Sequence, residues 1–407
     1  MSQLDDLIRV HCSGGVEWKT LEECCNILDN KRRPISKLAR IAGKYPYYGA
    51  NGIQDYVADY IFDGCFVLIG EDGSVITPNK TPVVNWASGR IWVNNHAHII
   101  AEKEGTLLRY LFYFLQTVDI SHLIRGAIPK LTGKDFRAIK IPLPPLEVQR
   151  EIVGILDLFD RLTLELTESL SEELELRKKQ YAYYREVLLS FDEKSPSVIK
   201  EMTKRLCSEG VEWKTLDEVF TIRNGYTPSK ANPDYWEGGT IPWFRMDDVR
   251  TNGRILEDSI QHITPAGVKG KLFEKDSIIL ATTATIGEHA LLMADALANQ
   301  QFTNFAICKS LKERLLPKFA FYYFFMIDEW CKKNTRVSSF PSVDMKKLKK
   351  QPFPLPPLEI QHKIVEILDK FDTLTTSLTE GIPAEIEARR KQYTYYRNKL
   401  LTFKEKQ

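Results

Sequence analysis

The chain has 407 residues, enough for two or three domains that each bury a core of their own. A hydrophobic fraction of 43% and a charged fraction of 27% are ordinary for a globular protein and exclude bulk disorder. The formal net charge of +2 is too small to indicate a nucleic-acid binder, so only local clusters of basic residues can support that function.

The termini and the cysteines favour a cytoplasmic protein. The first residues, Met-Ser-Gln-Leu-Asp-Asp, lack the basic region and apolar run of a signal peptide, and no apolar stretch is long enough to span a bilayer. The seven cysteines, an odd number without metal-type spacing, fit a reducing compartment. We expect Cys24, Cys25 and Cys65 to be buried thiols.

Long and short stretches of the chain occur twice. Residues 141–191 begin IPLPPLEVQREIVGILDLFDRL and end RKKQYAYYREVLLSF, and residues 353–403 begin FPLPPLEIQHKIVEILDKFDTL and end RRKQYTYYRNKLLTF. A shorter repeat, Cys-Ser-x-Gly-Val-Glu-Trp-Lys-Thr-Leu, occupies 12–21 and 207–216. The chain is therefore a tandem duplication of an insert followed by a long helix, and the two inserts have diverged while the repeated parts have not.

The first insert, about 22–140, reads as mixed α/β. Tyr45–Gly52 is predicted to be an aromatic loop rich in turns, Phe66–Gly70 a buried strand and Leu107–Leu115 a helix. By strand alternation, His96 and His98 would share one face, and this pair is more typical of packing or DNA contact than of a metal site. A basic cluster opens the insert, at Lys31, Arg32, Arg33, Lys37, Arg40 and Lys44.

The first repeated helix is predicted over about 147–190. Prolines block helix formation before it, and the acidic Glu147 suits the positive N-terminal end of the helix dipole. At about 1.5 Å per residue, these roughly 43 residues span about 65 Å. An apolar seam for a partner helix runs at spacings of three and four through Ile152, Ile155, Leu156, Phe159, Leu162, Leu166 and Leu170.

The second half repeats this plan with another insert. Ile241–Arg245 and Ser277–Thr283 are predicted strands, Pro317–Cys331 a helix, and a lysine-rich cluster closes the insert. The second seam is Ile364, Ile367, Leu368, Phe371, Leu374, Leu378 and Ile382, and Gly381 with Pro383 predicts a kink or break. Because the whole unit is repeated, the simplest packing lays the two helices antiparallel with the inserts at opposite ends. Two solvent-bridging helices that belong to unrelated domains are the alternative.

Catalytic signatures are absent in recognisable form. The Asn-Pro-Asp-Tyr of 232–235 lacks the second proline of the Asn-Pro-Pro-Tyr motif of amino-methyltransferases, and no glycine-rich cofactor turn precedes it. There is no Gly-x4-Gly-Lys-[Ser/Thr] phosphate loop. Pro233-Asp234 has no Glu-x-Lys partner at the spacing of a nuclease. We expect a chain without chemistry or a metal site of its own.

The repeated motifs together resemble those of the specificity subunits of type I restriction-modification enzymes. They are Pro-Leu-Pro-Pro-Leu-Glu-x-Gln at 142–149 and 354–361, Ile-Leu-Asp-x-Phe-Asp at 155–160 and 367–372, Leu-Thr-x-x-Leu-Thr-Glu at 162–168 and 374–380, and Lys-Gln-Tyr-x-Tyr-Tyr-Arg at 179–185 and 391–397. The openings Pro-Tyr-Tyr-Gly-Ala at 46–50 and Ile-Pro-Trp-Phe-Arg at 241–245 are also similar to motifs of that family.

The resemblance implies an α+β fold in which two α/β target recognition domains are joined by a pair of long antiparallel coiled-coil helices, with an internal pseudo-two-fold duplication. The predicted boundaries are 1–140 and 210–352 for the recognition domains, 141–191 and 353–407 for the helices, and 192–209 for a linker. Each domain would read half of a bipartite DNA target, and the helices would set the spacer.

The resemblance also implies partners. Two modification subunits would bring S-adenosylmethionine and methylate adenine, and two restriction subunits would use ATP and magnesium, so this chain itself would need no cofactor. Two copies of one surface suit two copies of one partner. The repeated helix ends are the predicted docking residues, Tyr181, Tyr184, Arg185, Tyr393, Tyr396 and Arg397.

Candidate DNA contacts are basic residues near loops for phosphates and polar residues for base edges. In the first insert they are Lys44, Tyr47, Asn51, Glu71, Asp72, Arg125 and Lys130. In the second they are Arg223, Tyr226, Thr227, Arg245, Asp247, Thr282, Thr283, Arg336 and Ser338. A structural role competes with DNA contact at each of them. Two other classes stay open for the chain, a fused methyltransferase or nuclease and a coiled-coil adaptor that binds proteins.

Overall fold

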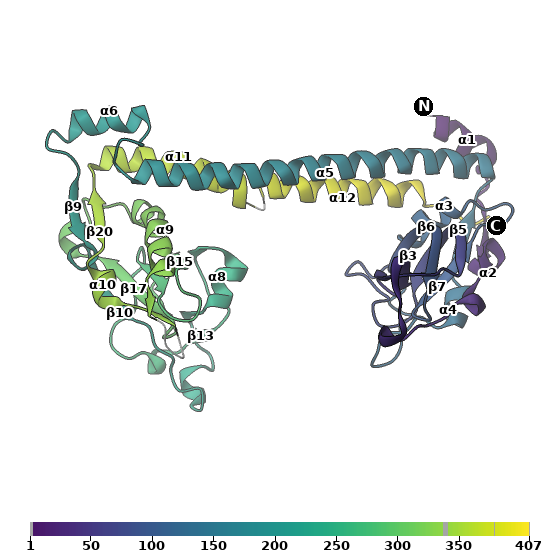
Figure 1. Cartoon of the computed structure of the whole chain (residues 1–407), viewed down its shortest axis with the longest axis horizontal. Coiled ribbons are helices and arrows are strands. Elements are labelled where there is room, and N and C mark those ends of the chain that lie inside the picture. The colour runs from purple at the N-terminus through teal and green to yellow at the C-terminus, as the bar shows by residue number, and fades with distance from the viewer. Residues whose placement is uncertain (1–2, 337–340, 378, 407) are drawn as a thin grey trace. The chain divides into compact units, whose positions relative to one another are not determined.

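The computed structural model describes residues 3–336, 341–377 and 379–406 and divides into two compact units (Figure 1). Unit 1 comprises residues 1–171 and 385–407, and unit 2 comprises residues 172–384. The chain passes from unit 1 to unit 2 within one helix and returns within another, so each unit contains one insert and parts of both repeated stretches. No helix within the described residues is long and apolar enough to cross a membrane.

Unit 1 is built on a six-stranded sheet of order β2-β7-β5-β6-β3-β4. Its elements are α1 (Gln3–His11), β1 (Glu17–Thr20), α2 (Leu21–Cys24), β2 (Asn26–Ile27), β3 (Ala42–Gly49), β4 (Gly52–Val57), β5 (Phe62–Gly70), β6 (Val84–Val93), β7 (Ala97–Ala101), α3 (Leu108–Leu115), α4 (Gly133–Arg137), β8 (Lys140–Leu143), the start of α5 (Leu146–Leu189) and most of α12 (Ile382–Leu400). The predicted strand at 66–70 and helix at 107–115 are confirmed as parts of β5 and α3.

Unit 2 carries a five-stranded sheet of order β10-β17-β14-β15-β12. Its elements are the end of α5, α6 (Ser197–Leu206), β9 (Glu212–Thr215), α7 (Leu216–Val219), β10 (Phe220–Asn224), β11 (Ile241–Phe244), α8 (Met246–Asn252), β12 (Ile255–Leu256), β13 (His262–Ile263), β14 (Ile278–Ala281), β15 (His289–Leu292), β16 (Leu297–Ala298), β17 (Phe302–Ile307), α9 (Pro317–Lys333), β18 (Thr335–Arg336), β19 (Ser342–Val343), α10 (Met345–Lys349), β20 (Pro352–Leu355) and α11 (Leu358–Thr376). The predicted strands at 241–245 and 277–283 and the helix at 317–331 are confirmed. The segment 192–209, predicted as a linker, contains α6, whose Ile199 lies in the core.

The two sheets share one arrangement although the inserts have little sequence in common. β2-β7-β5-β6 and β10-β17-β14-β15 have the same order, and all neighbouring strands are antiparallel. The short repeats fold alike too, because β1 pairs with β8 in unit 1 as β9 pairs with β20 in unit 2. One fold therefore carries two different sets of side chains.

Each sheet has a core on both faces because successive strand residues point to opposite sides. In β5, Val67 and Ile69 join the core formed with α3 and α5, while Phe66 and Leu68 join a second core on the other face. In unit 2, Ile278 and Leu280 of β14 share a core with α9, and Ile279 lies in a second core on the other face of the sheet. These central strand segments are thus covered on both sides.

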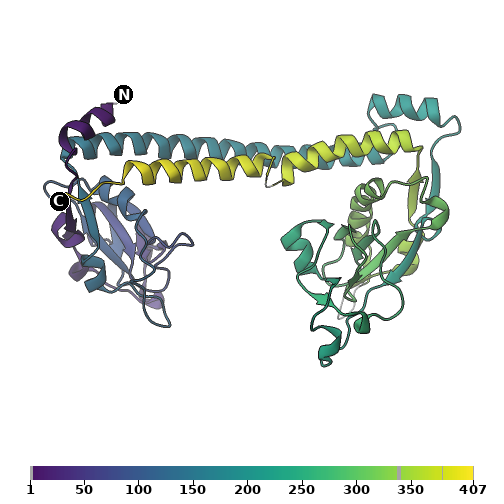
Figure 2. The ribbon, with the colours of Figure 1, turned by 180° about the vertical axis from the view of Figure 1, so that it is seen from behind.

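Antiparallel helix pairs occur within each unit, as Figures 1 and 2 both show. In unit 1 the rings of Phe159 and Tyr396 lie 5.9 Å apart, and Leu401, just after α12, shares a core with Ile152 near the start of α5. In unit 2 Tyr181 near the end of α5 stacks on Phe371 of α11 at 6.1 Å. The predicted long helix is confirmed as the 44 residues of α5.

The helix break predicted at Gly381 and Pro383 is also confirmed. α11 ends at Thr376, and α12 begins at Ile382 with proline in its first turn, where the missing N–H costs no helix hydrogen bond. A Cβ atom at Gly381 would lie 2.4 Å from the carbonyl oxygen of Thr373, so the chain can turn back this closely only at glycine.

Several predictions about local environment were wrong. The segment 45–52 forms the end of β3, a turn and the start of β4 rather than a loop, and Cys65 faces solvent in β5, whereas Cys24 and Cys25 are buried as expected. Along the seam, Leu162 and Leu166 are 49% and 40% exposed, and they line a hollow together with residues 389–396 of α12. Leu378 lies outside the described residues. The other seam residues are buried or half-buried, at Ile152, Ile155, Leu156, Phe159, Leu170, Ile364, Ile367, Leu368, Phe371, Leu374 and Ile382.

Candidate nucleic-acid interface

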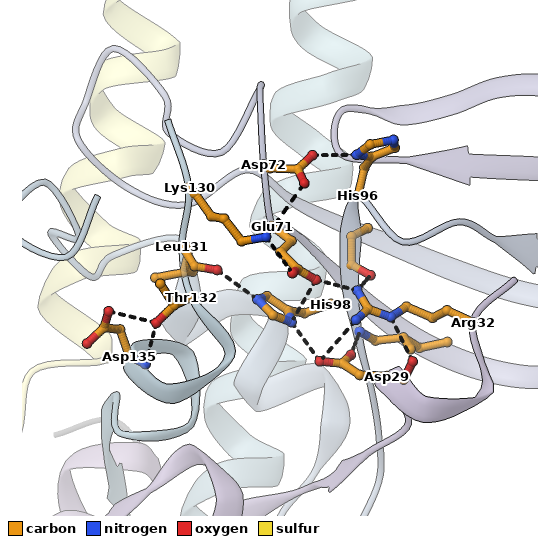
Figure 3. Close-up of polar contacts among 12 residues, drawn as sticks. Asp29, Arg32, Glu71, Asp72, His96, His98, Lys130, Leu131, Thr132 and Asp135 are labelled. Atoms are coloured by element: carbon orange, nitrogen blue, oxygen red, sulfur yellow. Dashed lines mark hydrogen bonds and ion pairs between the residues drawn. The ribbon is translucent and has the colours of Figure 1, made fainter. Parts of the chain in front are cut away.

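A charged cluster lies in unit 1 where β5 ends and β7 begins (Figure 3). Glu71 and Asp72 follow β5 directly. Arg32, only 12% exposed in its side chain, donates from Nη1 to Glu71 Oε2 at 2.6 Å, and Lys130 Nζ lies 3.3 Å from Glu71 Oε1. His96 bonds to Asp72. Three of the predicted DNA residues, Glu71, Asp72 and Lys130, thus come together with basic and imidazole groups that were not among the predicted contacts.

His98 is the buried centre of this cluster. Its ring is stacked on Phe136 with centroids 4.1 Å apart, and its Nε2 lies 3.1 Å from the carbonyl oxygen of Leu131. Nδ1 lies 2.7 Å from Asp29 Oδ2. Both ring nitrogens of His98 are thus engaged by oxygen atoms of the protein. His96 and His98 do not share a strand face as predicted, since β7 begins at Ala97 and His96 lies in the preceding turn.

Asp29 completes the cluster as an ionised group. Burial alone would raise the pKa of Asp29, but hydrogen bonds from His98 and the Ile99 N–H, together with the Arg32 charge, hold that pKa below its usual value. Arg32 also donates to the backbone oxygens of Asp29 and Ala97, at 2.9 and 2.7 Å. The network therefore fastens the segment after β2 to the ends of two central strands.

Asp29, Glu71 and His98 are the one group in the described part of the chain whose ligand atoms lie close enough together to hold a metal ion. Arg32 contacts both carboxylates, and Lys130 contacts Glu71. Both nitrogens of His98 are engaged as well. A divalent ion would have to displace the contacts of two cations with these carboxylates, so the donor set does not fit a metal.

The backbone beside this cluster forms a short hairpin, which we call the 125–130 hairpin. Arg125 and Lys130 exchange both backbone hydrogen bonds, at 3.2 and 3.1 Å. Gly73 donates to the Pro129 oxygen at 2.9 Å, and Leu131 donates to the Glu71 oxygen at 2.8 Å. The hairpin is thus held against the loop that follows β5.

Unit 2 has the same positions with neutral side chains. Asn26 and Thr221 follow the repeated Leu21 and Leu216 by the same spacing and pair with Ala101 and Ala306. From these two pairs, the strand registers extend the equivalence along β2 and β10, along β7 and β17, and across to β5 and β14. Three positions of unit 1 are thereby equivalent to three positions of unit 2. The pairs are Asp29 with Asn224, His98 with Thr303, and Glu71 with Thr282.

The three neutral residues also bond to one another. Thr303 Oγ1 lies 3.1 Å from Asn224 Oδ1 and 3.0 Å from Thr282 Oγ1. Val343 donates to the Thr282 oxygen at 2.9 Å, the counterpart of the bond from Leu131 to Glu71. We call the place of these equivalent residues the sheet end. It is one backbone framework that carries an ionic network in unit 1 and a hydroxyl–amide network in unit 2.

A second equivalence involves the two opening motifs. Tyr47 and Tyr48 run parallel to the end of β6, and Trp243 and Phe244 run parallel to β16. The turn that follows each partner begins with Asn94 or Asn299, which donates to the Tyr48 or Phe244 oxygen at 3.0 Å. By this register Asn51 and Asp247, both predicted DNA contacts and both exposed, occupy matching places just beyond the strands.

The remaining candidates lie in varied surroundings. Lys44 is exposed on β3, while Tyr47 is buried and its hydroxyl bonds to the backbone of Ile35. Arg223 donates to the backbone oxygens of Lys271 and Leu272, Tyr226 to that of Gly267, and Thr227 to the Gln300 side chain. The Arg245 and Asp247 side chains form an ion pair at 3.5 Å, and the backbones of Thr283 and Ser342 form an isolated antiparallel β-bridge. Arg336 lies in β18, and Ser338 lies outside the described residues.

The predicted docking residues mostly hold each unit together. Tyr181 is 7% exposed, Arg185 lies 3.8 Å above the Phe325 ring, and Arg397 donates to Gln116 Oε1 at 2.9 Å. Burial raises the pKa of Tyr393 to about 12. Tyr184 stacks on Phe371 at 5.2 Å and Tyr396 is 39% exposed, while the neighbouring Tyr183 and Tyr395, which had not been selected, are 60% and 61% exposed.

Sequence reasoning also missed a pair of anchors in the repeated motifs. Gln149 is fully buried, accepts from the Leu107 N–H at 2.9 Å and donates to Pro144 at 2.8 Å. Gln361 makes the matching bonds to Leu316 and Pro356. Each glutamine thus links its long helix to the start of the helix beneath it, α3 or α9, which is why the motif ends in Gln.

The first aspartate of each Ile-Leu-Asp-x-Phe-Asp motif is a further anchor. Asp157 accepts from Arg109 at 2.7 Å and from the Tyr113 hydroxyl at 2.6 Å. Asp369 accepts from Lys318 at 2.7 Å and from the Tyr322 hydroxyl. The repeated residues therefore fix each α/β domain to its helix in the same way.

Comparison with known proteins agrees with this duplicated arrangement. The family model described as type I restriction modification DNA specificity domain matches residues 14–176 and 208–388. The chain is 36% identical to a putative type I restriction enzyme specificity subunit of Haemophilus influenzae, over 95% of this chain and 96% of that protein. It is 51% identical to the specificity subunit of the type I restriction enzyme EcoprrI of Escherichia coli, over 51% of this chain and 54% of that protein.

Solved structures share the fold at low sequence identity. A chain from a study of complex assembly and conformational transition of the type I R-M system aligns with a TM-score of 0.60 at 18% identity, over 95% of this chain and 97% of that one. The HsdS subunit of Thermoanaerobacter tengcongensis aligns with a TM-score of 0.53 at 18% identity, over 96% of each chain.

Proposed function

Because the chain belongs to the DNA specificity family of type I restriction-modification systems, we propose that each unit reads one half of a bipartite DNA target at its sheet end. The observation that carries this proposal is the pair of equivalent networks, Asp29–His98–Glu71 and Asn224–Thr303–Thr282. One backbone framework, fastened at the same place by two different sets of polar side chains, can hold different loops against two different base sequences in one geometry.

The repeated helices would set the number of base pairs between the two half-sites. α5 is a single helix of 44 residues, about 66 Å at about 1.5 Å per residue, and its two ends belong to different units. A helix without an internal proline keeps its length when it binds, so it can fix a distance.

The chain would act as the non-catalytic member of a larger cytoplasmic complex. We expect two modification subunits, which would carry S-adenosylmethionine and methylate adenine, and two restriction subunits, which would use ATP and magnesium. Exposed Tyr183 and Tyr395, in the two copies of one motif, are suited to dock two copies of one partner.

Binding to duplex DNA at several salt concentrations tests this function against the adaptor alternative. The purified complex of this chain with its modification subunit should bind its target duplex more tightly than scrambled duplex, and the logarithm of its affinity should fall linearly with that of the salt concentration. Affinity that does not depend on salt or sequence would favour the adaptor. Binding of S-adenosylmethionine by the isolated chain would instead favour the fused enzyme.

A further inference from the structure

The 125–130 hairpin of unit 1 carries two side chains that are largely exposed to solvent, those of Arg125 and Ile128. Ile128 is 71% exposed, and the Arg125 side chain is 72% exposed and lies 3.9 Å from the Asp135 carboxylate. Gly126 has a φ of +88°, a backbone conformation that favours glycine and makes the turn tight. An isolated exposed isoleucine is common on protein surfaces, so its surroundings must decide whether it has a role.

Those surroundings hold the hairpin in place through its second strand and the residue that follows it. Pro129 accepts from Gly73, Leu131 donates to Glu71, and the Leu131 oxygen accepts from the buried His98. Lys130 at the hairpin base lies against Glu71 and Asp72, at 3.3 and 3.9 Å. The Lys130 charge is thus largely neutralised within the protein, whereas the Arg125 charge is directed to solvent.

Unit 2 has an antiparallel strand pair at the same place. β18 pairs with β19, and Val343 of β19 donates to the Thr282 oxygen as Leu131 donates to the Glu71 oxygen. The sequence before Ser342 reads Phe-Pro, as the sequence before Lys130 reads Ile-Pro, although residues 337–340 lie outside the described residues. Both inserts therefore retain an apolar residue and a proline at a position where little else is shared.

We propose that the 125–130 hairpin enters a groove of duplex DNA, with Ile128 in apolar contact with a base edge and Arg125 on a phosphate. This inference rests on the proposed function of the chain. An apolar side chain can contact the thymine methyl group in the major groove or wedge between bases, and a cation beside it adds a sequence-independent attraction. Arg32, His98, Asp29, Glu71 and Lys130 are then positioning residues, because they hold the hairpin rather than touch the bases.

The test uses the complex of the full chain with its modification subunit and a fluorescent duplex that carries the complete target. Ile128→Ala should weaken binding about tenfold, the loss expected for one base contact. The weakening should disappear when the half-site read by unit 1 is scrambled and should persist when the half-site read by unit 2 is scrambled. Val10→Ala, a substitution of a residue that is 68% exposed on α1, is the matched control and should change nothing.

A second substitution separates the two predicted contacts. Arg125→Ala should weaken binding to all duplexes alike and lower the salt slope by about one, as loss of one phosphate contact does, without changing base preference. Equal affinities of wild type and Ile128→Ala would overturn the inference, and so would a loss confined to assembly with the modification subunit. If wild type itself does not prefer its target duplex, the proposed function fails, which is a different result.

Discussion

Replacement of Arg32 by methionine should loosen one sheet end and leave unit 2 intact. The Arg32 side chain is 12% exposed and donates to Glu71 and to the backbone oxygens of Asp29 and Ala97. Removing one partner of a buried ion pair costs about 3–5 kcal/mol. Because Glu71 keeps Lys130 and Asp29 keeps His98, the lower end applies, about 3 kcal/mol.

Hydrogen–deuterium exchange resolved by peptide measures this change in each unit separately. A loss of about 3 kcal/mol should accelerate exchange of amides around residues 97–101 and 125–132 by about 100-fold, since each 1.4 kcal/mol is about a factor of ten. Peptides of unit 2 should exchange as in wild type. Arg32→Lys keeps the charge but loses the planar guanidinium group, so its exchange rates in unit 1 should lie between those of wild type and Arg32→Met.

The adjacent Arg33 supplies the matched control, because its side chain is exposed. Arg33→Met should leave exchange unchanged in both units. Equal effects of the two methionine substitutions would refute the assignment of Arg32 to the network. Acceleration throughout both units would show instead that the substitution acts on the whole chain.

Three other perturbations test the remaining parts of the account. Insertion of one four-residue unit beside the Leu-Thr-Leu-Glu stretch of α5 should lengthen the helix by about 6 Å, one to two base-pair steps, so the spacer should grow while both half-sites stay the same; an unchanged spacer in the methylated motif would argue against the helices as its determinant. Exchange of residues 22–140 for another insert of this family should alter one half-site, and alteration of both would mean that the units do not read independently. Asp29 has a lowered pKa, so its stabilising ionised form is fully present above its unfolded pKa of about 4 and is lost as the pH falls through the folded value. Wild type should therefore lose amide protection around residues 97–101 on acidification below about pH 4, whereas Asp29→Asn should have lost most of it at neutral pH, and a similar acid response of the two proteins would contradict this role of Asp29.

The helices and the duplication could be predicted because their signals are local and occur twice. Proline before α5, apolar spacing along it and the Gly381–Pro383 break all act within a few residues. The exposure of Leu162 and Leu166 could not be predicted in this way, because it depends on which residues α12 places opposite them. A pattern of apolar spacing indicates that a partner helix exists, but it does not show whether the side chains of that partner are polar or apolar.

The sheet-end network could be predicted only in fragments. Glu71 and Lys130 were predicted as contacts because they are polar and close to predicted loops, but Arg32 and Lys130, the two basic partners of Glu71, lie 39 and 59 residues from it in the sequence. Strand register alone brings them together, and register is set by long-range pairing that a single sequence does not display. The same reason explains why the equivalence of Glu71 and Thr282 became visible only in the structure.

Sequencing of methylated adenine in DNA from cells that express this chain with its modification subunit tests the central claim most directly. The account predicts a split motif, two short specific half-sites separated by a spacer of fixed length, with one methylated adenine on each strand. An assembled complex that produces no new methylation, or one that methylates a single continuous sequence, would contradict the claim that the two units read separate halves of one target.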